Sequence, residues 1–316
     1  MTYILGIDTS AYTTSIALID ADTKEILADE RKVLQVKKGQ KGLRQQEAVF
    51  QHLINLPQVY DRISQDLSKV KMVSVSSKPR NEDGSYMPVF IVGQNFGKVI
   101  SNTLSCKYIE YSHQENHIGA SLIDNYKNIN EELLAVHISG GTTEFVLAKK
   151  SSKGFETKIV GGTKDITFGQ LIDRLGISMD FPFPCGKHME EYLQGKHVEK
   201  IATPPISKDS FINLSGMENY YGNLLNKHSK ETIINSLFKY IAECIIHIIN
   251  SLSDLQFKTV IISGGVASNS YIRNYILDNN SDYEILLPTV ENSSDNAVGL
   301  AFLPIIDRWY NETKTH

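Results

Sequence analysis

The chain has 316 residues, of which 41% are hydrophobic and 22% charged, and its formal net charge is -4 with a pI of about 6.2. This length is enough for two domains with sizeable cores, and the composition is ordinary for a globular protein. Because dedicated nucleic-acid binders are usually basic, the charge argues against that class. Any contact with RNA therefore has to come from a local basic patch or from a partner.

The cysteines and the termini indicate a reducing compartment. The three cysteines lie far apart and form no C-x-x-C pair, which argues against a disulfide scaffold. The N-terminus enters an apolar strand at once and lacks the pattern of a signal peptide. The longest apolar segment, Ile241 to Ile249, contains Glu243 and His247 and is too short to span a bilayer. We therefore expect a soluble, cytoplasmic protein without membrane contact.

The first predicted elements are a hairpin, a helix, a strand and a second helix. Residues 3–7 and 15–19 form two apolar strands around the hydroxyl-rich turn DTSAYTTS. A helix is predicted over 45–67, where Val49, Leu53, Leu56 and Tyr60 recur at spacings of three and four. A strand over 70–76 and a glycine-interrupted helix over 89–104 follow.

A second hairpin repeats the first about 130 residues later. Its strands are 133–138 and 144–148, joined by Ser-Gly-Gly-Thr-Thr. The strongest helical pattern covers 230–252, and a buried strand over 259–262 leads through two glycines into a helix from Ser268 onward. We predict two lobes, 1–115 and 116–300, and a C-terminal helix over 301–316 that returns to the first lobe.

Three turns that follow apolar strands are candidates for phosphate binding. Small and hydroxyl residues let backbone amides approach an anion, and a helix N-terminus adds a positive dipole end. Each turn is also compatible with an ordinary hairpin or helix cap, and neither a Rossmann nor a P-loop pattern is present. The turns predict an adenine-nucleotide site and mark these candidates: Asp8, Ser10 and Thr13 as catalytic residues; Gly140, Gly141, Gly264, Gly265 and Asn269 for the nucleotide.

His113 and His117 are candidates for metal ligands. In a helix this spacing places both imidazoles on one face. Glu115 faces away, since two residues turn a helix by about 200°, so the pair lacks the base of a zinc protease. Asp295 is of the type that completes a two-histidine, one-carboxylate site. The alternative is two surface histidines and an N-capping aspartate.

The order of the motifs resembles the TsaD family, which transfers a threonylcarbamoyl group to tRNA. GIDTS, SHQENH, ISGGTTEF, FINLSG, ISGGVASN and SSDNA follow one another over nearly the whole chain. The resemblance implies a two-lobed α/β fold of the actin, sugar-kinase and hexokinase (ASKHA) type with a nucleotide cleft. It implies one divalent metal, iron or zinc with magnesium as a further option, on His113, His117 and Asp295. It also implies contacts with ATP, ADP, AMP or threonylcarbamoyl-AMP from Ile138, Ser139, Gly140, Gly141, Thr142, Asp173, Gly186 and Asn269.

Three segments depart from the family pattern. The turn that usually reads S-G-G-H-T is Ser139-Gly140-Gly141-Thr142-Thr143. The loop that usually reads S-C-D-E-T is Ser10-Ala11-Tyr12-Thr13-Thr14 and has no acid, and the A-G-P-G-L loop is replaced by a segment over 77–88. These changes suit a paralogue with another acceptor or acyl group, or a subgroup that makes the same transfer differently. TsaB- and TsaE-like protein partners, and tRNA, are expected from the resemblance.

Three other interpretations remain open at this point. A non-catalytic partner subunit is favoured by the missing acid at position 13. It is opposed by the presence of the three candidate metal ligands, His113, His117 and Asp295. A metallopeptidase lacks a correctly placed glutamate. A small-molecule kinase of the same fold leaves the histidine pair unexplained.

Overall fold

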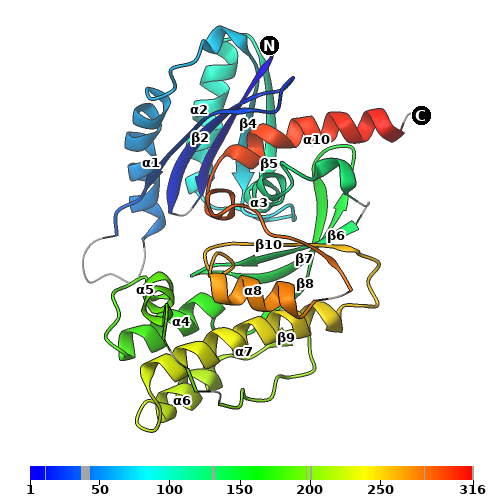
Figure 1. Cartoon of the computed structure of the whole chain (residues 1–316). Helices are drawn as coiled ribbons and strands as arrows, with labels where there is room; N and C mark the ends of the chain where they lie inside the picture. Colours follow the sequence, from blue (N-terminus) through cyan, green and yellow to red (C-terminus); the bar gives the residue numbers. More distant parts are fainter. Residues whose placement is uncertain are drawn as a thin grey trace. The chain divides into compact units, whose positions relative to one another are not determined.

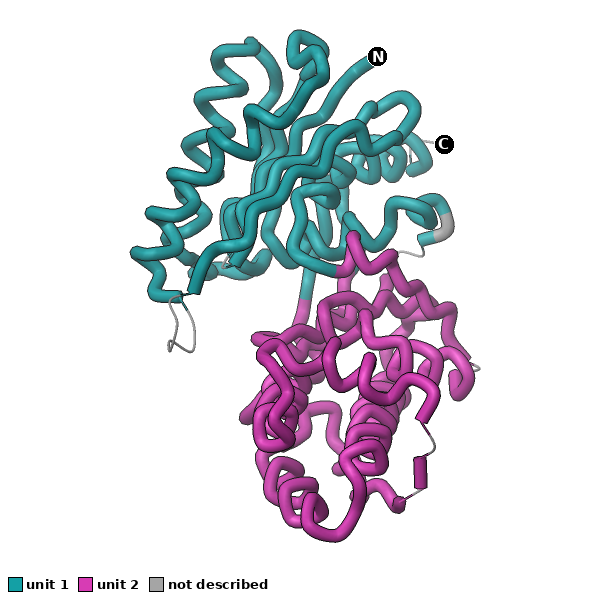
Figure 2. Tube along the Cα trace, turned by 60° about the vertical axis from the view of Figure 1, so that its left-hand side comes forward, with its two compact units in different colours: residues 1–129, 149–157, 294–316 teal, residues 130–148, 158–293 magenta. Residues whose placement is uncertain are grey.

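The computed structural model describes residues 1–10, 12–36, 43–129, 132–196, 198–199, 201–280 and 282–314. The chain divides into two compact units (Figure 2). Unit 1 comprises residues 1–129, 149–157 and 294–316, and unit 2 comprises residues 130–148 and 158–293. Unit 1 thus includes residues 116–129, 149–157 and 294–300, which the sequence analysis assigned to the second lobe.

Unit 1 is built on a five-stranded sheet in the order β3-β2-β1-β4-β5 (Figure 1). The first three strands are antiparallel neighbours, and β1 pairs with β4, and β4 with β5, in parallel. The predicted hairpin is confirmed by the register of Asp8 with Ser15 and of Ser10 with Thr13. The strands are β1 (Tyr3–Ser10), β2 (Thr13–Asp20), β3 (Ile26–Val33), β4 (Val70–Lys78) and β5 (Lys107–Ser112).

Helices pack on this sheet through contacts with its central strands. The helices α1 (Gln45–Tyr60) and α2 (Val89–Thr103) contact each other and contact β2 and β1 respectively. The helices α3 (His113–Ser121) and α10 (Val298–Lys314) pack on each other, and α10 contacts β1. Short 3-10 turns cover Leu67–Lys69 and Tyr126–Asn128.

The helix α1 is shorter than predicted, and its buried face includes polar residues. The helix ends at Tyr60 rather than near residue 67, and Leu53 is 57% exposed. The side chains that face the core include two polar ones and are Ala48, His52, Asn55, Leu56 and Val59. The apolar spacing therefore predicted the helix, and of its four residues only Leu53 points away from the core, since Leu56 is buried and Val49 and Tyr60 are partly buried against it.

Unit 2 is built on a six-stranded sheet in the order β11-β10-β6-β7-β8-β9. The predicted second hairpin forms β6 and β7, and β10 runs parallel to β6. The strands are β6 (Glu132–Ile138), β7 (Thr143–Lys150), β8 (Phe155–Thr163), β9 (Phe211–Ile212), β10 (Thr259–Ser263) and β11 (Glu284–Leu286).

Helix α7 is the central helix of unit 2. The helix is long and apolar enough to cross a membrane. However, 72% of its most apolar 18-residue stretch is buried inside the protein, as in the core helix of a globular domain. Its isoleucines pack in one large cluster with α4, α5 and β6. The helices of unit 2 are α4 (Phe168–Ser178), α5 (Cys185–Leu193), α6 (Ser215–Leu224), α7 (Lys230–Ser251), α8 (Ser270–Asp278) and α9 (Val290–Ser293).

Candidate functional site

The two predicted histidine ligands lie near the start of α3. Ser112 accepts a hydrogen bond from the Glu115 backbone N–H, and the Glu115 carboxylate accepts from the Ser112 N–H at 2.7 Å, which is a capping box. This cap starts the helix at His113 and so places His117 one turn further on the same face. The Glu115 carboxylate forms part of this cap, which agrees with the prediction that the histidine pair lacks the general base of a zinc protease.

The candidate metal site joins α3 to the loop before α10. The Nε2 atoms of His113 and His117 are 3.1 Å apart, and Asp295 Oδ1 lies 3.7 Å from the first and 3.5 Å from the second. A metal with ligands at about 2.0–2.2 Å separates neighbouring ligand atoms by about 3 Å. The described donor atoms therefore fit one divalent ion, as the sequence predicted for these three residues.

Asp8 supports this site from behind. It is fully buried at the end of β1, and its Oδ1 lies 3.1 Å from His113 Nδ1. A carboxylate on one ring nitrogen fixes the imidazole so that the other nitrogen faces the metal. Asp8, predicted as a catalytic residue that orients a metal or water, is thus placed behind a ligand rather than among the ligands.

In this cluster His113 lies between two carboxylates, those of Asp8 and Asp295. Burial alone would lower the pKa of His113, but Asp8 and Asp295 outweigh it and raise that pKa to about 9. Burial would likewise raise the pKa of Asp8, and the charge of His113 lowers it instead. Burial and the neighbouring His113 both lower the pKa of His117. Without metal, His113 is therefore protonated and His117 neutral near pH 7.

Close backbone packing brings Asp295 to the histidines. A Cβ on Gly299 would lie 1.9 Å from the Asn116 carbonyl oxygen, so only glycine allows α10 to approach α3 this closely. The Asn116 side chain accepts from the Leu300 N–H at 2.8 Å. From β3, the Arg31 guanidinium donates to the Asp295 carbonyl at 3.3 Å. Asn296, not Asp295, caps α10, because its side chain accepts from the Val298 N–H.

The pKa of His113 predicts how metal binding responds to pH. Metal binding must release the His113 proton, so apparent affinity should fall about tenfold for each pH unit below about 9. A histidine with an ordinary pKa of about 6.5 would start this fall only below about pH 6.5. Titration with Zn²⁺ or Co²⁺ between pH 6 and 9 measures the slope. An affinity that is flat from pH 7 to 9 would contradict a protonated His113.

Ser10 and Thr13 flank the tip of the first hairpin. They pair across the strands, and alternation places them on the same sheet face as Asp8. Thr13 is buried, with only 7% of its surface exposed. Ala11, between them, lies outside the described residues. The candidate catalytic residues are therefore gathered beside the metal site, within unit 1.

The two glycine turns of unit 2 lie side by side. The Ile138 carbonyl at the end of β6 accepts from the Val266 N–H at 3.0 Å. Gly264 has a φ of +104°, and a Cβ there would lie 2.2 Å from the same carbonyl. The Ser139 N–H closes its turn onto the Thr142 carbonyl at 2.8 Å. The structure thus brings together the segments 138–142 and 263–269, as expected of a shared site.

Three of the four glycines in these turns leave open space. No described atom lies within 4 Å of a Cβ built on Gly140, Gly141 or Gly265. The side-chain amide nitrogen of Asn269 is buried and makes no hydrogen bond within the described residues, while its oxygen caps α8 at the Ile272 N–H. Exposed backbone beside an unused donor suits a polar ligand. Both the predicted cap and the predicted contact are compatible with Asn269.

The remaining predicted nucleotide residues lie on α4 and α5. A Cβ on Gly169 would lie 2.5 Å from the Gly140 Cα, so the first turn of α4 abuts the β6–β7 turn. Further along α4, the Asp173 carboxylate accepts from the Cys185 N–H at 2.8 Å, directly before Gly186. Burial raises the pKa of Asp173. The helix α5 begins at Cys185, within the segment FPFPCGKH.

Two residues that support these sites escaped the sequence analysis. Asp165 accepts from the Leu214 and Ser215 N–H groups at 2.8 Å each and so holds the FINLSG segment. Although burial opposes it, these bonds lower the pKa of Asp165 to about 2. His52 is fully buried on α1 and lies 2.8 Å from Thr14. Neither has a local sequence signal, since their partners are distant in the chain.

Solved structures with related folds are found at low sequence identity. Component A of (R)-2-hydroxyglutaryl-CoA dehydratase from Acidaminococcus fermentans has a TM-score of 0.57 at 16% identity, over 96% of this chain and 97% of that chain. HypF from T. kodakarensis has a TM-score of 0.62 at 12% identity, over 99% of this chain and 48% of that one. A ROK-family glucokinase from Streptomyces griseus has a TM-score of 0.52 at 9% identity, over 95% and 98%. The chain therefore has the predicted ASKHA-type fold.

Sequence comparison identifies the family. Two curated relatives, from Thermosipho africanus and Thermosipho melanesiensis, are named tRNA N6-adenosine threonylcarbamoyltransferase and are 26% and 27% identical over 94% of this chain and 92% of each relative. The family model described as TsaD, tRNA N6-adenosine threonylcarbamoyltransferase, matches residues 25–302. The chain thus belongs to the TsaD family and is a transferase.

Proposed function

We propose that this protein transfers a threonylcarbamoyl group from threonylcarbamoyl-AMP to the N6 amine of a tRNA adenosine. The observation that supports this proposal most directly is the convergence of His113, His117 and Asp295 in a chain of the TsaD family. Asp8 contacts His113 on the side of the ring away from this cluster. In the step, the adenosine N6 forms a bond to the carbamoyl carbon, the bond from that carbon to the phosphate oxygen breaks, AMP leaves, and N6 loses a proton to solvent.

The chain's own residues would orient the donor. The open space beside the exposed glycines Gly140, Gly141 and Gly265 suits phosphate or ribose, and the Asn269 amide is available to donate to a ribose or base. The three metal-type residues would hold iron, zinc or magnesium, which supplies Lewis-acid stabilisation of phosphate charge when bound. Such a reaction depends on orientation more than on a strong base.

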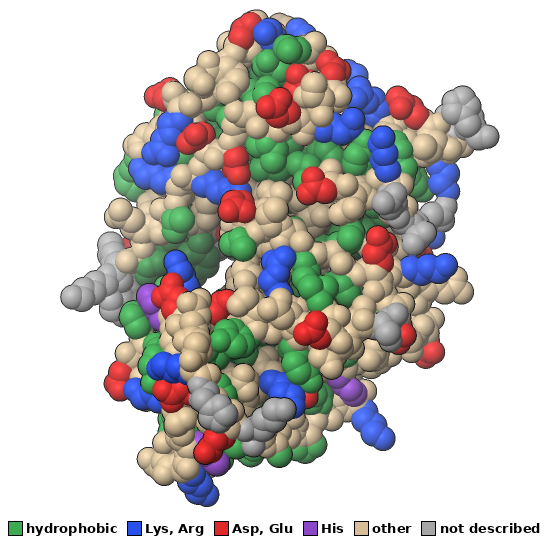
Figure 3. Space-filling view, viewed as in Figure 1, with side chains coloured by type: hydrophobic (Ala, Val, Ile, Leu, Met, Phe, Trp, Pro, Cys, Tyr) green, Lys and Arg blue, Asp and Glu red, His purple; other side chains and the backbone are tan. Residues whose placement is uncertain are grey.

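Recognition of tRNA would draw on a local surface or a partner rather than on overall charge. Acidic and basic side chains are interspersed on the face seen in Figure 3. On α1 of unit 1, Phe50, Leu53 and Ile54 are 63%, 57% and 46% exposed at spacings of three and four. This apolar strip supports the proposal of a TsaB-like protein partner; a TsaE-like partner rests on the family resemblance alone.

The decisive experiment supplies threonylcarbamoyl-AMP directly. The protein is incubated with this donor and unmodified tRNA, with and without TsaB- and TsaE-like proteins, and threonylcarbamoyladenosine is measured by mass spectrometry of digested tRNA. Modified nucleoside that depends on this protein supports the proposal. Failure in every combination, with the protein folded and metal-loaded, would overturn it and favour a non-catalytic subunit.

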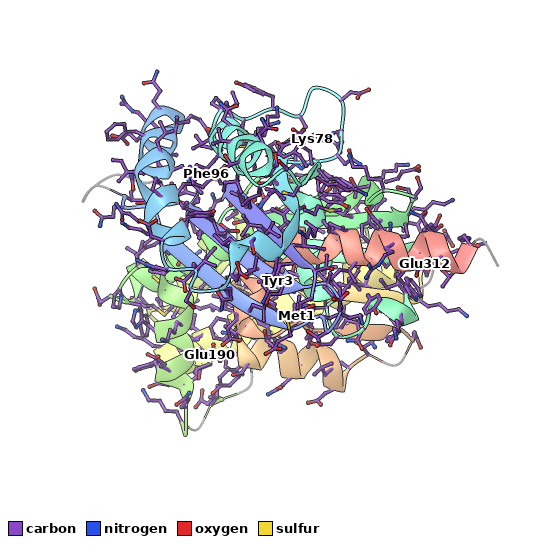
Figure 4. The ribbon with its side chains drawn as sticks, turned by 90° about the horizontal axis from the view of Figure 1, so that it is seen from above. Met1, Tyr3, Lys78, Phe96, Glu190 and Glu312 are labelled. Atoms are coloured by element: carbon purple, nitrogen blue, oxygen red, sulfur yellow. The ribbon has the colours of Figure 1, made fainter. Side chains whose placement is uncertain are left out.

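The altered acceptor loops define a finer proposal, in which substrate choice differs from that of other family members. The segment over 77–88 begins at the end of β4, marked by Lys78 in Figure 4. Its Pro79 carbonyl accepts from the Gln114 N–H at 3.0 Å, next to His113. The changed segment therefore borders the metal site, where an acceptor has to approach.

Thr13→Glu tests the role of the missing acid. Because Thr13 is buried on the face of Asp8, a carboxylate there should be repelled by Asp8 and should lower thermal stability. If the acid steers the acceptor amine, transfer to tRNA should nevertheless rise several-fold in the folded fraction. Thr13→Gln, which matches the size without the charge, is the control. Equal tRNA activity in wild type, Glu and Gln variants would contradict the altered-acceptor proposal.

A further inference from the structure

Helix α1 contacts the first hairpin through a buried polar group on the sheet face opposite Asp8. His52 and Thr14 are both fully buried, and His52 Nδ1 lies 2.8 Å from Thr14 Oγ1. The Asn55 side-chain amide, one turn further along α1, donates to the same hydroxyl at 3.4 Å. Three buried polar side chains thus meet where apolar packing would be simpler.

The hydrogen bonds at Thr14 link all three side chains. Asn55 donates to the Thr14 hydroxyl, and that hydroxyl shares a further hydrogen bond with His52 Nδ1, in which the donor depends on the tautomer of the ring. Burial lowers the pKa of His52, while Asp8 and the Ser10 backbone oppose this shift. The Nε2 atom of the ring is buried and has no hydrogen-bond partner in the described part of the chain.

A second anchor holds the neighbouring strand. The Thr9 hydroxyl donates to the Val89 carbonyl at 2.9 Å and accepts from the Gly93 N–H at 3.2 Å, both in α2. Thr9 pairs with Thr14 across the hairpin. The end of the hairpin is therefore tied to α1 through β2 and to α2 through β1, and the ties lie directly next to Asp8 and Ser10.

We propose that His52 is a positioning residue that holds the β1–β2 tip, and with it Asp8 and Ser10, in the geometry required for transfer. This inference rests on the proposed function. His52 does not contact the predicted metal ligands; it acts through Thr14. Displacing a reacting geometry by about 1 Å costs about 10²-fold in rate, so even a partial loosening of the tip should be measurable.

The experiment compares Thr14→Val and His52→Leu with His52→Asn, in the full-length protein supplied with donor, tRNA and any required partners. Thr14→Val is nearly isosteric, and His52→Asn keeps a polar acceptor near the Nδ1 position. We expect kcat to fall about tenfold in the first two variants, with metal content and KM for the donor within about twofold of wild type, and to recover in His52→Asn. The double variant Thr14→Val/His52→Leu should have a kcat no lower than that of either single variant, because both changes remove the same hydrogen bond.

An activity-independent measurement separates this inference from the proposed function. Amide hydrogen exchange in peptides covering residues 8–15 should accelerate in Thr14→Val and His52→Leu and remain unchanged elsewhere. His247→Leu, which alters a histidine on α7 in unit 2, is the matched control. Inactive wild-type protein would refute the proposed function alone. Unchanged exchange and unchanged kcat, or effects of the two single variants that multiply in the double variant, would overturn the role of His52.

Discussion

His117→Ala should abolish specific metal binding without unfolding the protein. His117 is one of the three proposed ligands, and burial and the neighbouring His113 lower its pKa, so its removal opens the site without stranding a charge. Loss of one ligand should weaken metal affinity by at least about 10²-fold, and transfer should fall in parallel. Metal analysis after dialysis, together with thermal unfolding, measures both effects. His188→Ala, at a histidine whose side chain is 41% exposed, is the control.

The corresponding change at His113 should behave differently. Its imidazole is the partner of the fully buried Asp8, so His113→Ala leaves a buried carboxylate without its counter-charge. Breaking such a pair costs about 3–5 kcal/mol. Replacement without unfolding is therefore expected at His117 and not at His113. Metal retained at wild-type stoichiometry in His117→Ala would refute the assignment of the site.

Gly264→Ala should strongly destabilise unit 2. Its φ of +104° disfavours any residue with a Cβ, and that Cβ would lie 2.2 Å from the Ile138 carbonyl oxygen. The clash is with backbone, so relief requires β10 to move away from β6. We expect a loss of about 3 kcal/mol or more in the free energy of unfolding. Denaturant titration followed by circular dichroism measures it.

Gly265→Ala is the matched comparison, one residue away. No described atom lies within 4 Å of its Cβ, and the residue is exposed, so stability should change little. If a nucleotide occupies this space, calorimetry with ATP, ADP or AMP should show affinity reduced about tenfold or more, since an added methyl group keeps the phosphate from the backbone. Unaltered nucleotide affinity in Gly265→Ala would argue against a nucleotide site at this turn, whatever the stability of Gly264→Ala.

Local sequence patterns determined the elements and the identity of the metal-type residues. Strict apolar runs gave both hairpins, and the histidine spacing with Ser112 and Glu115 encodes a capped helix on which the ligands share a face. These signals are readable because hydrogen bonding and side-chain direction within a hairpin or helix depend on near neighbours in sequence. The order of motifs added the family, which no single turn could specify.

Only the tertiary structure decided which side chains support the site. Asp8 and His113 are 105 residues apart in the chain, and Asn296 rather than Asp295 caps α10. The same holds for His52, whose polar partner lies on another element 38 residues away and whose burial the apolar spacing of α1 did not indicate. Contacts between distant segments follow from how helices and strands pack, and close approaches such as Gly299 on Asn116 fix them to within an ångström. Local sequence patterns do not determine these distances, because the distances are set by the packing of the whole unit.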